Sequence, residues 1–132
     1  MTTAIKQRID AELVDRWQKL VSDANWAKGE VIASYSANGL WSRDDEFSHI
    51  VGGVTKDYLR VLRMVWDRFS DVRSTYPSLR WTHFFVALEW PDACVWLRRA
   101  DVDGLTPSEM SRTRLYELVQ IEKEKKAAKG DQ

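Results

Sequence analysis

The clearest pattern in the chain is a run of apolar residues at helical spacing near its N-terminus. The run alternates steps of four and three residues, a seven-residue repeat that predicts one long helix over about Thr3 to Ala37. Its members are Leu13, Trp17, Leu20, Ala24, Ala27 and Val31. We favour an internal role for this seam, because nearly every helix that faces a core carries such a stripe. Pairing with the same helix in a dimer is the alternative.

A second pattern, from Asp44 to Phe69, predicts a short helix, a tight turn and a longer helix. Gly52 and Gly53 permit the positive φ angles of a reversal, and Thr55 is suited to cap the following helix. That helix repeats apolar residues on one side. The outline is that of a helix-turn-helix, although the doubled glycine makes the turn one residue longer than usual. An ordinary antiparallel helix pair is the alternative.

Basic residues on and after the second helix are the candidate site. In a helix-turn-helix this helix enters the major groove of DNA, where arginine makes bidentate contacts to guanine. We expect Lys56, Arg60 and Arg63 to contact bases or phosphates. Outer phosphate contacts would come from Arg68, Arg73 and Arg80.

The rest of the chain predicts further helices and no sheet. We expect Ser78 to cap a helix through Leu88, and Pro91 to lie in the first turn of the next helix. The segment from Thr106 to Glu109 reads as a capping box that starts the last helix. The predicted fold is therefore all-α, with five to six helices, a central helix-turn-helix-like pair and a long N-terminal helix. Residues 1–122 form a single domain, and residues 123–132 are a charged tail that frays.

A second helix pair, near the C-terminus, also has helix-turn-helix spacings, at Ala100, Gly104 and Met110. Arg99 and Asp103 stand where that pattern requires apolar residues. We therefore rank this pair below the central one.

Composition limits the choice of function. The 20 basic and 20 acidic residues cancel, so the chain lacks the basic excess typical of nucleic-acid binders. Residues 56–80 nevertheless carry a net charge of +3, and residues 81–111 one of −3. DNA binding would then be weak and strongly salt-dependent. Most of the seven tryptophans should be buried, because indole rings remove large areas from water.

Catalytic, metal and membrane signals are not found in the sequence. Cys94 is the single cysteine, flanked by apolar residues, which predicts a buried, inert thiol in a reducing interior. Together with His49 and His83 it gives too few ligands for a zinc site, which needs about four, and no cofactor motif occurs. No apolar run reaches ~18 residues. We expect a cytoplasmic protein that is not an enzyme and uses no metal or cofactor.

Several segments resemble known proteins: Glu46-Phe47, the glycine turn, Val65-Trp66, the stretch from Arg80 to Leu88, and Trp90. They resemble a small family of helical bacterial proteins, chiefly planctomycete, and more distantly the LmbU-type helix-turn-helix regulators of actinobacteria. The resemblance implies a regulator of transcription or plasmid maintenance, with the helix after Thr55 nearest double-stranded DNA.

DNA binding, by a monomer or a homodimer, is thus the leading hypothesis. The alternative is a helical adaptor that recognises another protein through its long N-terminal helix or an exposed tryptophan patch.

Overall fold

The structure, a computed structural model, describes residues 3–37 and 44–130, and these contain six α-helices and no strand. The prediction of an all-α fold with a long N-terminal helix is confirmed. The elements are α1 (Thr3–Ala37), α2 (Asp44–Val51), α3 (Lys56–Phe69), the 3₁₀ turn η2 (Arg73–Thr75), α4 (Trp81–Val86), α5 (Ala93–Asp103) and α6 (Pro107–Gly130). No helix in the described part of the chain is long and apolar enough to cross a membrane.

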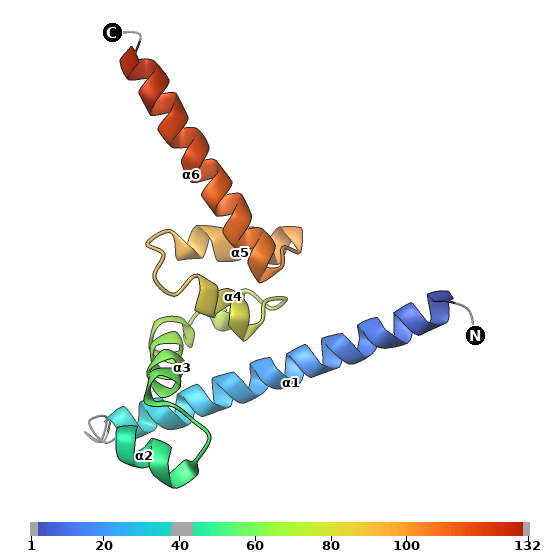
Figure 1. Ribbon diagram of the computed structural model, residues 1–132, viewed down its shortest axis with the longest axis vertical. Helices are drawn as coiled ribbons and strands as arrows, with labels where there is room; N and C mark the ends of the chain where they lie inside the picture. Colours follow the sequence, from blue (N-terminus) through green and yellow to red (C-terminus); the bar gives the residue numbers. More distant parts are fainter. Residues whose placement is uncertain (1–2, 38–43, 131–132) are drawn as a thin grey trace.

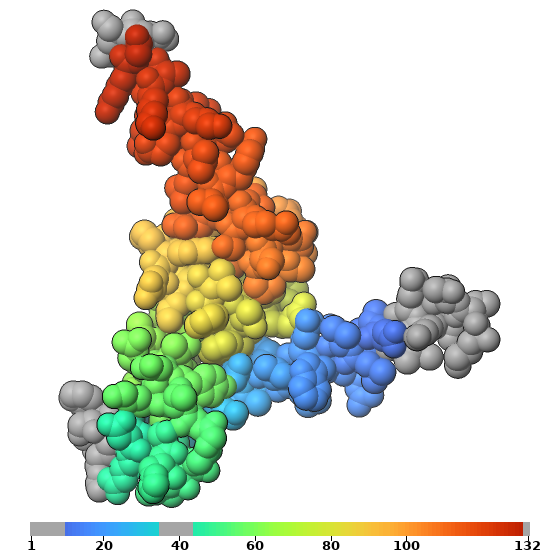
Figure 2. Space-filling model, in the orientation of Figure 1, coloured from blue at the N-terminus to red at the C-terminus, as the bar shows by residue number. Residues whose placement is uncertain are grey.

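The helices form a body with two projecting arms (Figure 1). α3, α4 and α5 follow one another as a column, and α2 lies beside the end of the column where α1 crosses it. The N-terminal part of α1 projects away from this column, and α6 continues beyond its other end. The space-filling view shows that both arms protrude from the body (Figure 2).

The core is centred on the crossing of α1 with α3. A Cβ atom added at Gly29 of α1 would lie 2.9 Å from the backbone oxygen of Leu62, so the two helices approach closely there. Trp26 continues the contact, with its ring edge-on to Phe84 of α4 at 5.2 Å. Phe84 also meets Phe69 at 5.3 Å, so aromatic rings from three helices fill the centre.

Two buried polar residues of α1 hold the neighbouring helices. The backbone N–H of Trp81, at the start of α4, donates to the hydroxyl of Ser22 at 2.9 Å. The hydroxyl of Tyr58, on α3, donates to Asn25 at 2.6 Å. Buried polar atoms need such partners, because losing one costs about 1–3 kcal/mol.

The fourth and fifth helices start later than predicted. Ser78 does not cap a helix, because its backbone N–H donates to the carboxylate of Asp101 at 3.0 Å and its hydroxyl also bonds Asp101. α4 instead begins at Trp81, and α5 begins at Ala93, after Pro91. Long-range bonding by Ser78 has replaced the local cap.

The start of α6 follows the sequence signal. Thr106 accepts from the N–H of Glu109 at 3.1 Å, and Glu109 accepts from the N–H of Thr106 at 3.0 Å, which completes the predicted capping box. These bonds favour the carboxylate and lower the pKa of Glu109. α6 then continues to Gly130, through residues 123–130 of the predicted frayed tail, all of them exposed.

Candidate functional site

The turn between α2 and α3 has the geometry that its sequence predicts. Gly52 and Gly53 adopt φ angles of 74° and 71°, and Thr55 accepts from the N–H of Tyr58 at 3.1 Å. The N–H of Gly52 donates to the carbonyl of Ser48 at 3.0 Å, which closes the end of α2. α3 therefore starts at Lys56, with its basic residues on a well-defined helix.

Lys56 and Arg60, one turn apart at the start of α3, are exposed. The ammonium of Lys56 lies 3.9 Å from Asp45, but the two side chains are 64% and 82% exposed. Such exposed pairs contribute about 0–1 kcal/mol and leave the cation accessible. These two residues fit the predicted outward orientation.

Arg63, by contrast, bonds to α2. Its two terminal nitrogens donate to both carboxylate oxygens of Asp44, at 3.0 and 2.7 Å. The side chains are only 14% and 17% exposed, so the pair is shielded from water. In this arrangement Arg63 is not free to contact DNA and instead joins the two helices.

Arg68 is bonded across the body. Its guanidinium donates to the backbone carbonyls of Ala87, at 3.3 Å, of Leu88, and of Trp90, at 2.6 Å. These carbonyls follow the short helix α4, where unpaired acceptors collect at a helix end. Arg68 thus stabilises the α4–α5 connection, and these bonds occupy part of its set of five N–H donors.

Arg73 and Arg80 are also partly withdrawn from solvent. The guanidinium of Arg73 stacks over the ring of Trp26 at 4.7 Å and lies 5.4 Å from that of Trp66. Cation–π contacts of this kind are worth about 0.5–2 kcal/mol. Arg80 is half-buried at the start of α4, where its backbone N–H donates to His83. The six predicted residues therefore do not form one continuous cationic surface.

Acidic residues further neutralise this region. α2 and α3 together carry four basic and five acidic side chains, a net charge of −1 with histidine neutral. Phosphate binding needs an excess of cations that displaces counterions. The electrostatics of the helix pair therefore argue against strong DNA binding.

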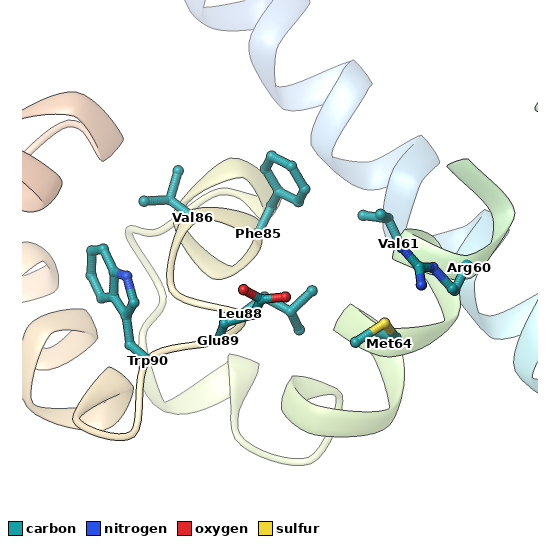
Figure 3. Close-up of a pocket in the computed structure, with 8 residues that line it drawn as sticks. All are labelled: Arg60, Val61, Met64, Phe85, Val86, Leu88, Glu89 and Trp90. Atoms are coloured by element: carbon teal, nitrogen blue, oxygen red, sulfur yellow. The ribbon is translucent and has the colours of Figure 1, made fainter. Parts of the chain in front are cut away.

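A groove of about 400 Å³ lies beside Arg60, between α3 and the end of α4 (Figure 3). Six of its eight lining residues are apolar, and the other two are one cation and one anion. The lining residues are Arg60, Val61, Met64, Phe85, Val86, Leu88, Glu89 and Trp90. No nucleophile or general base accompanies Glu89 among them.

The candidate metal and nucleophilic residues lie apart. His83 is buried; its Nδ1 accepts from Arg80 and its Nε2 donates to the carbonyl of Leu105 at 2.8 Å. Burial lowers the pKa of His83, which keeps the ring neutral. Cys94 is exposed, so the prediction of a buried thiol is wrong. α5 buries Ala93 and Leu97, and this leaves position 94 on its outer side. The described residues contain no group of three potential metal ligands.

One arginine of the second helix pair, Arg114, is also bonded within the fold. Gly104 ends α5 with a φ of 68°. Arg114 of α6 donates to Asp92 at 3.0 Å, and the indole of Trp96 donates to the same carboxylate at 2.9 Å. Burial opposes ionisation of Asp92, yet these hydrogen bonds together lower its pKa. These bonds hold α6 against the start of α5.

The α1 seam differs most from what the sequence predicts. All six of its residues are exposed, including Trp17 at 70%, Leu20 at 65% and Leu13 at 55%. The favoured interpretation, that this seam packs inside the domain, is wrong. α1 packs against the body with its other side, which carries Ser22, Asn25, Trp26, Gly29 and Ile32.

Further apolar residues widen this exposed surface. Val14 and Val21, beside the seam, are 54% and 42% exposed. Near the other end of α1, an apolar pocket of about 270 Å³ opens between α1, α2 and α3, lined in part by Val31, Phe47 and Val51. The described part of α1 therefore presents apolar side chains that are largely exposed from Leu13 to Val31.

Comparisons with models of protein families, with curated proteins and with solved structures found no match.

Proposed function

We propose that this protein is a helical interaction module that binds another helix through the N-terminal arm of α1. We call the segment from Leu13 to Ala24 the seam arm. The observation that supports the proposal is an apolar seven-residue repeat that is exposed throughout this segment. A contiguous exposed apolar surface typically marks a binding site for a protein or membrane.

The stability of helices gives a second reason. A helix gains most of its stability in water by packing an apolar face against something else. The N-terminal part of the seam arm projects from the body, and Leu13, Trp17 and Leu20 are 55%, 70% and 65% exposed. A partner would supply the missing contacts.

The spacing indicates what kind of partner fits. Steps of four and three residues place side chains so that they insert between those of a second helix lying nearly parallel or antiparallel. The charged residues Arg16 and Asp23 flank the stripe, as in coiled coils, where flanking charges select the partner. We therefore expect the partner to be an amphipathic helix.

Photo-cross-linking in native extract tests this proposal. The photo-reactive amino acid p-benzoylphenylalanine replaces Trp17, and the matched control carries it at Lys19, on the other side of α1. We expect the first variant to give one discrete adduct, whose cross-linked peptide comes from a single helix, of this chain or another. Equal adduct patterns from the two positions, or none at position 17, would contradict the proposal.

DNA binding through α3 is a second candidate, supported by the exposed pair Lys56 and Arg60. The pair lies in the first turns of the helix, the part that enters the major groove in helix-turn-helix proteins. Titration of a fluorescent duplex at two salt concentrations tests it. Arg60→Ala should weaken binding and reduce the salt slope by about 1, with Lys19→Ala as the control. A duplex that stays unbound at low salt would exclude this candidate.

A further inference from the structure

We infer that the helix bound by the seam arm is the seam arm of a second copy of this chain, running antiparallel. This inference rests on the proposed function and specifies its partner. In the alignment that follows, Leu13 of one copy faces Ala24 of the other.

The sizes of the seam residues fit this alignment. In an antiparallel pair of such helices, the seam residues face one another in layers. Each layer joins one of the two apolar positions of the repeat in one helix to the other position in its partner. Here the four layers place Leu13 against Ala24 twice and Trp17 against Leu20 twice, because a twofold axis relates the copies. The outer layers combine a large with a small side chain, and the two bulky pairs lie at the centre.

The flanking charges also fit. On one edge of the seam, Arg16 of each copy faces Asp23 of the other, which forms two opposite-charge pairs and no like-charge pair. On the other edge, Val14 faces Val21 twice. All four residues are exposed, and Asp23 and Val21 lie at the edges of hollows that α1 forms with the body.

A parallel alignment uses these residues less well. It would place Trp17 against Trp17 and Arg16 beside Val21, leaving the arginine without an acid. Asp23 would meet Lys28, whose ammonium already lies over the ring of Tyr58 at 5.9 Å. The antiparallel alignment is therefore the one that matches both charge and size.

The body leaves room for the second helix. Leu13, Leu20 and Ala24 of the seam are exposed, and the N-terminal part of α1 protrudes from the body in the space-filling view (Figure 2). Trp17 is exposed too, although it lines a shallow hollow with Thr82 and Pro107. The seam arm spans 12 residues, about 18 Å of helix. Pairing along this length would use exposed side chains and leave the buried residues of α1 in their present contacts.

A charge exchange tests the alignment. The dimer dissociation constant of the full chain is measured by sedimentation equilibrium for the parent, Arg16→Glu, Asp23→Lys and the double variant. Each single change replaces two attractive contacts by two repulsive ones and should weaken the dimer roughly tenfold. The double variant exchanges the charges and should restore the parent value, whereas Lys19→Glu should leave it unchanged.

Disulfide trapping gives the orientation independently. Leu13→Cys and Ala24→Cys are made as single variants in a Cys94→Ser background and oxidised separately and as a mixture. The antiparallel alignment predicts a disulfide-linked dimer mainly in the mixture, joined between positions 13 and 24. Parallel pairing would instead link each variant to itself.

The results separate this inference from the proposed function. A monomeric chain, or a dimer that the double variant fails to restore, would overturn the antiparallel self-pairing. If position 17 then cross-links to a helix of a different protein, the interaction module stands and only the identity of its partner is wrong.

Discussion

The bond between Arg63 and Asp44 provides a quantitative test of how α2 is held against α3. Substituting either residue by alanine leaves the other charge largely shielded, since the two side chains are 14% and 17% exposed. The bidentate geometry, at 2.7 and 3.0 Å, is that of a strong charge-assisted pair. Each single substitution should therefore destabilise the protein.

The loss of folding free energy on each single substitution lies between two limits. Exposed pairs contribute about 0–1 kcal/mol, whereas breaking a fully buried pair costs about 3–5 kcal/mol. For this largely shielded pair we expect each single substitution to cost about 2 kcal/mol. Much of that cost comes from the stranded charge, so the double substitution should cost less than the sum, with a coupling energy of about 1–2 kcal/mol.

Urea unfolding followed by tryptophan fluorescence measures this coupling. The cycle uses Arg63→Ala, Asp44→Ala and the double variant, and the matched control is the same cycle for Lys56 and Asp45. The exposed control pair, at 3.9 Å, should show almost no coupling. A coupling energy for Arg63 and Asp44 no larger than the control would refute a stabilising role and return Arg63 to the candidate DNA contacts.

Three further predictions concern Gly29, His83 and Cys94. Gly29→Ala should lower the melting temperature. The added methyl group overpacks against the backbone of Leu62, which costs about 1–3 kcal/mol, and this outweighs a gain in helix propensity of about 1 kcal/mol. An unchanged or raised melting temperature would contradict the close crossing of α1 and α3. The free energy of unfolding should fall as the pH drops below about 6.5, because the unfolded chain gains a proton that buried His83 resists. His83→Asn should flatten this pH dependence. Cys94 should react with a thiol reagent in the native state, at a rate that denaturant barely raises; protection until unfolding would contradict its exposure.

Local patterns predicted much of the backbone. The long first helix, the cap at Thr55, the glycine turn and the capping box at Thr106 all follow the sequence, because each depends on residues within a few positions of one another. The all-α class follows from the same helical spacing. These features need no knowledge of which helices meet.

The side of α1 that packs could not be predicted in this way. Its packed side carries Ser22, Asn25 and Gly29, whose partners lie on α3 and α4. Because these residues are small or polar, they do not contribute to an apolar repeat. The partners of the arginines could not be predicted for a related reason. Arg63 and Arg73 find their partners in Asp44 and Trp26, 19 and 47 positions away, and only the assembled fold brings them together.

The central claim, that the seam arm is the interface between two copies of this chain, is tested most directly by the mass of the protein in solution. Trp17 is 70% exposed, so Trp17→Glu should leave the folded monomer intact while placing a charge in the proposed interface. Sedimentation equilibrium should give twice the 15.4 kDa chain mass for the parent and the single mass for the variant, with equal helicity by circular dichroism. Equal masses for the two proteins, with both folded, would contradict self-association through this face.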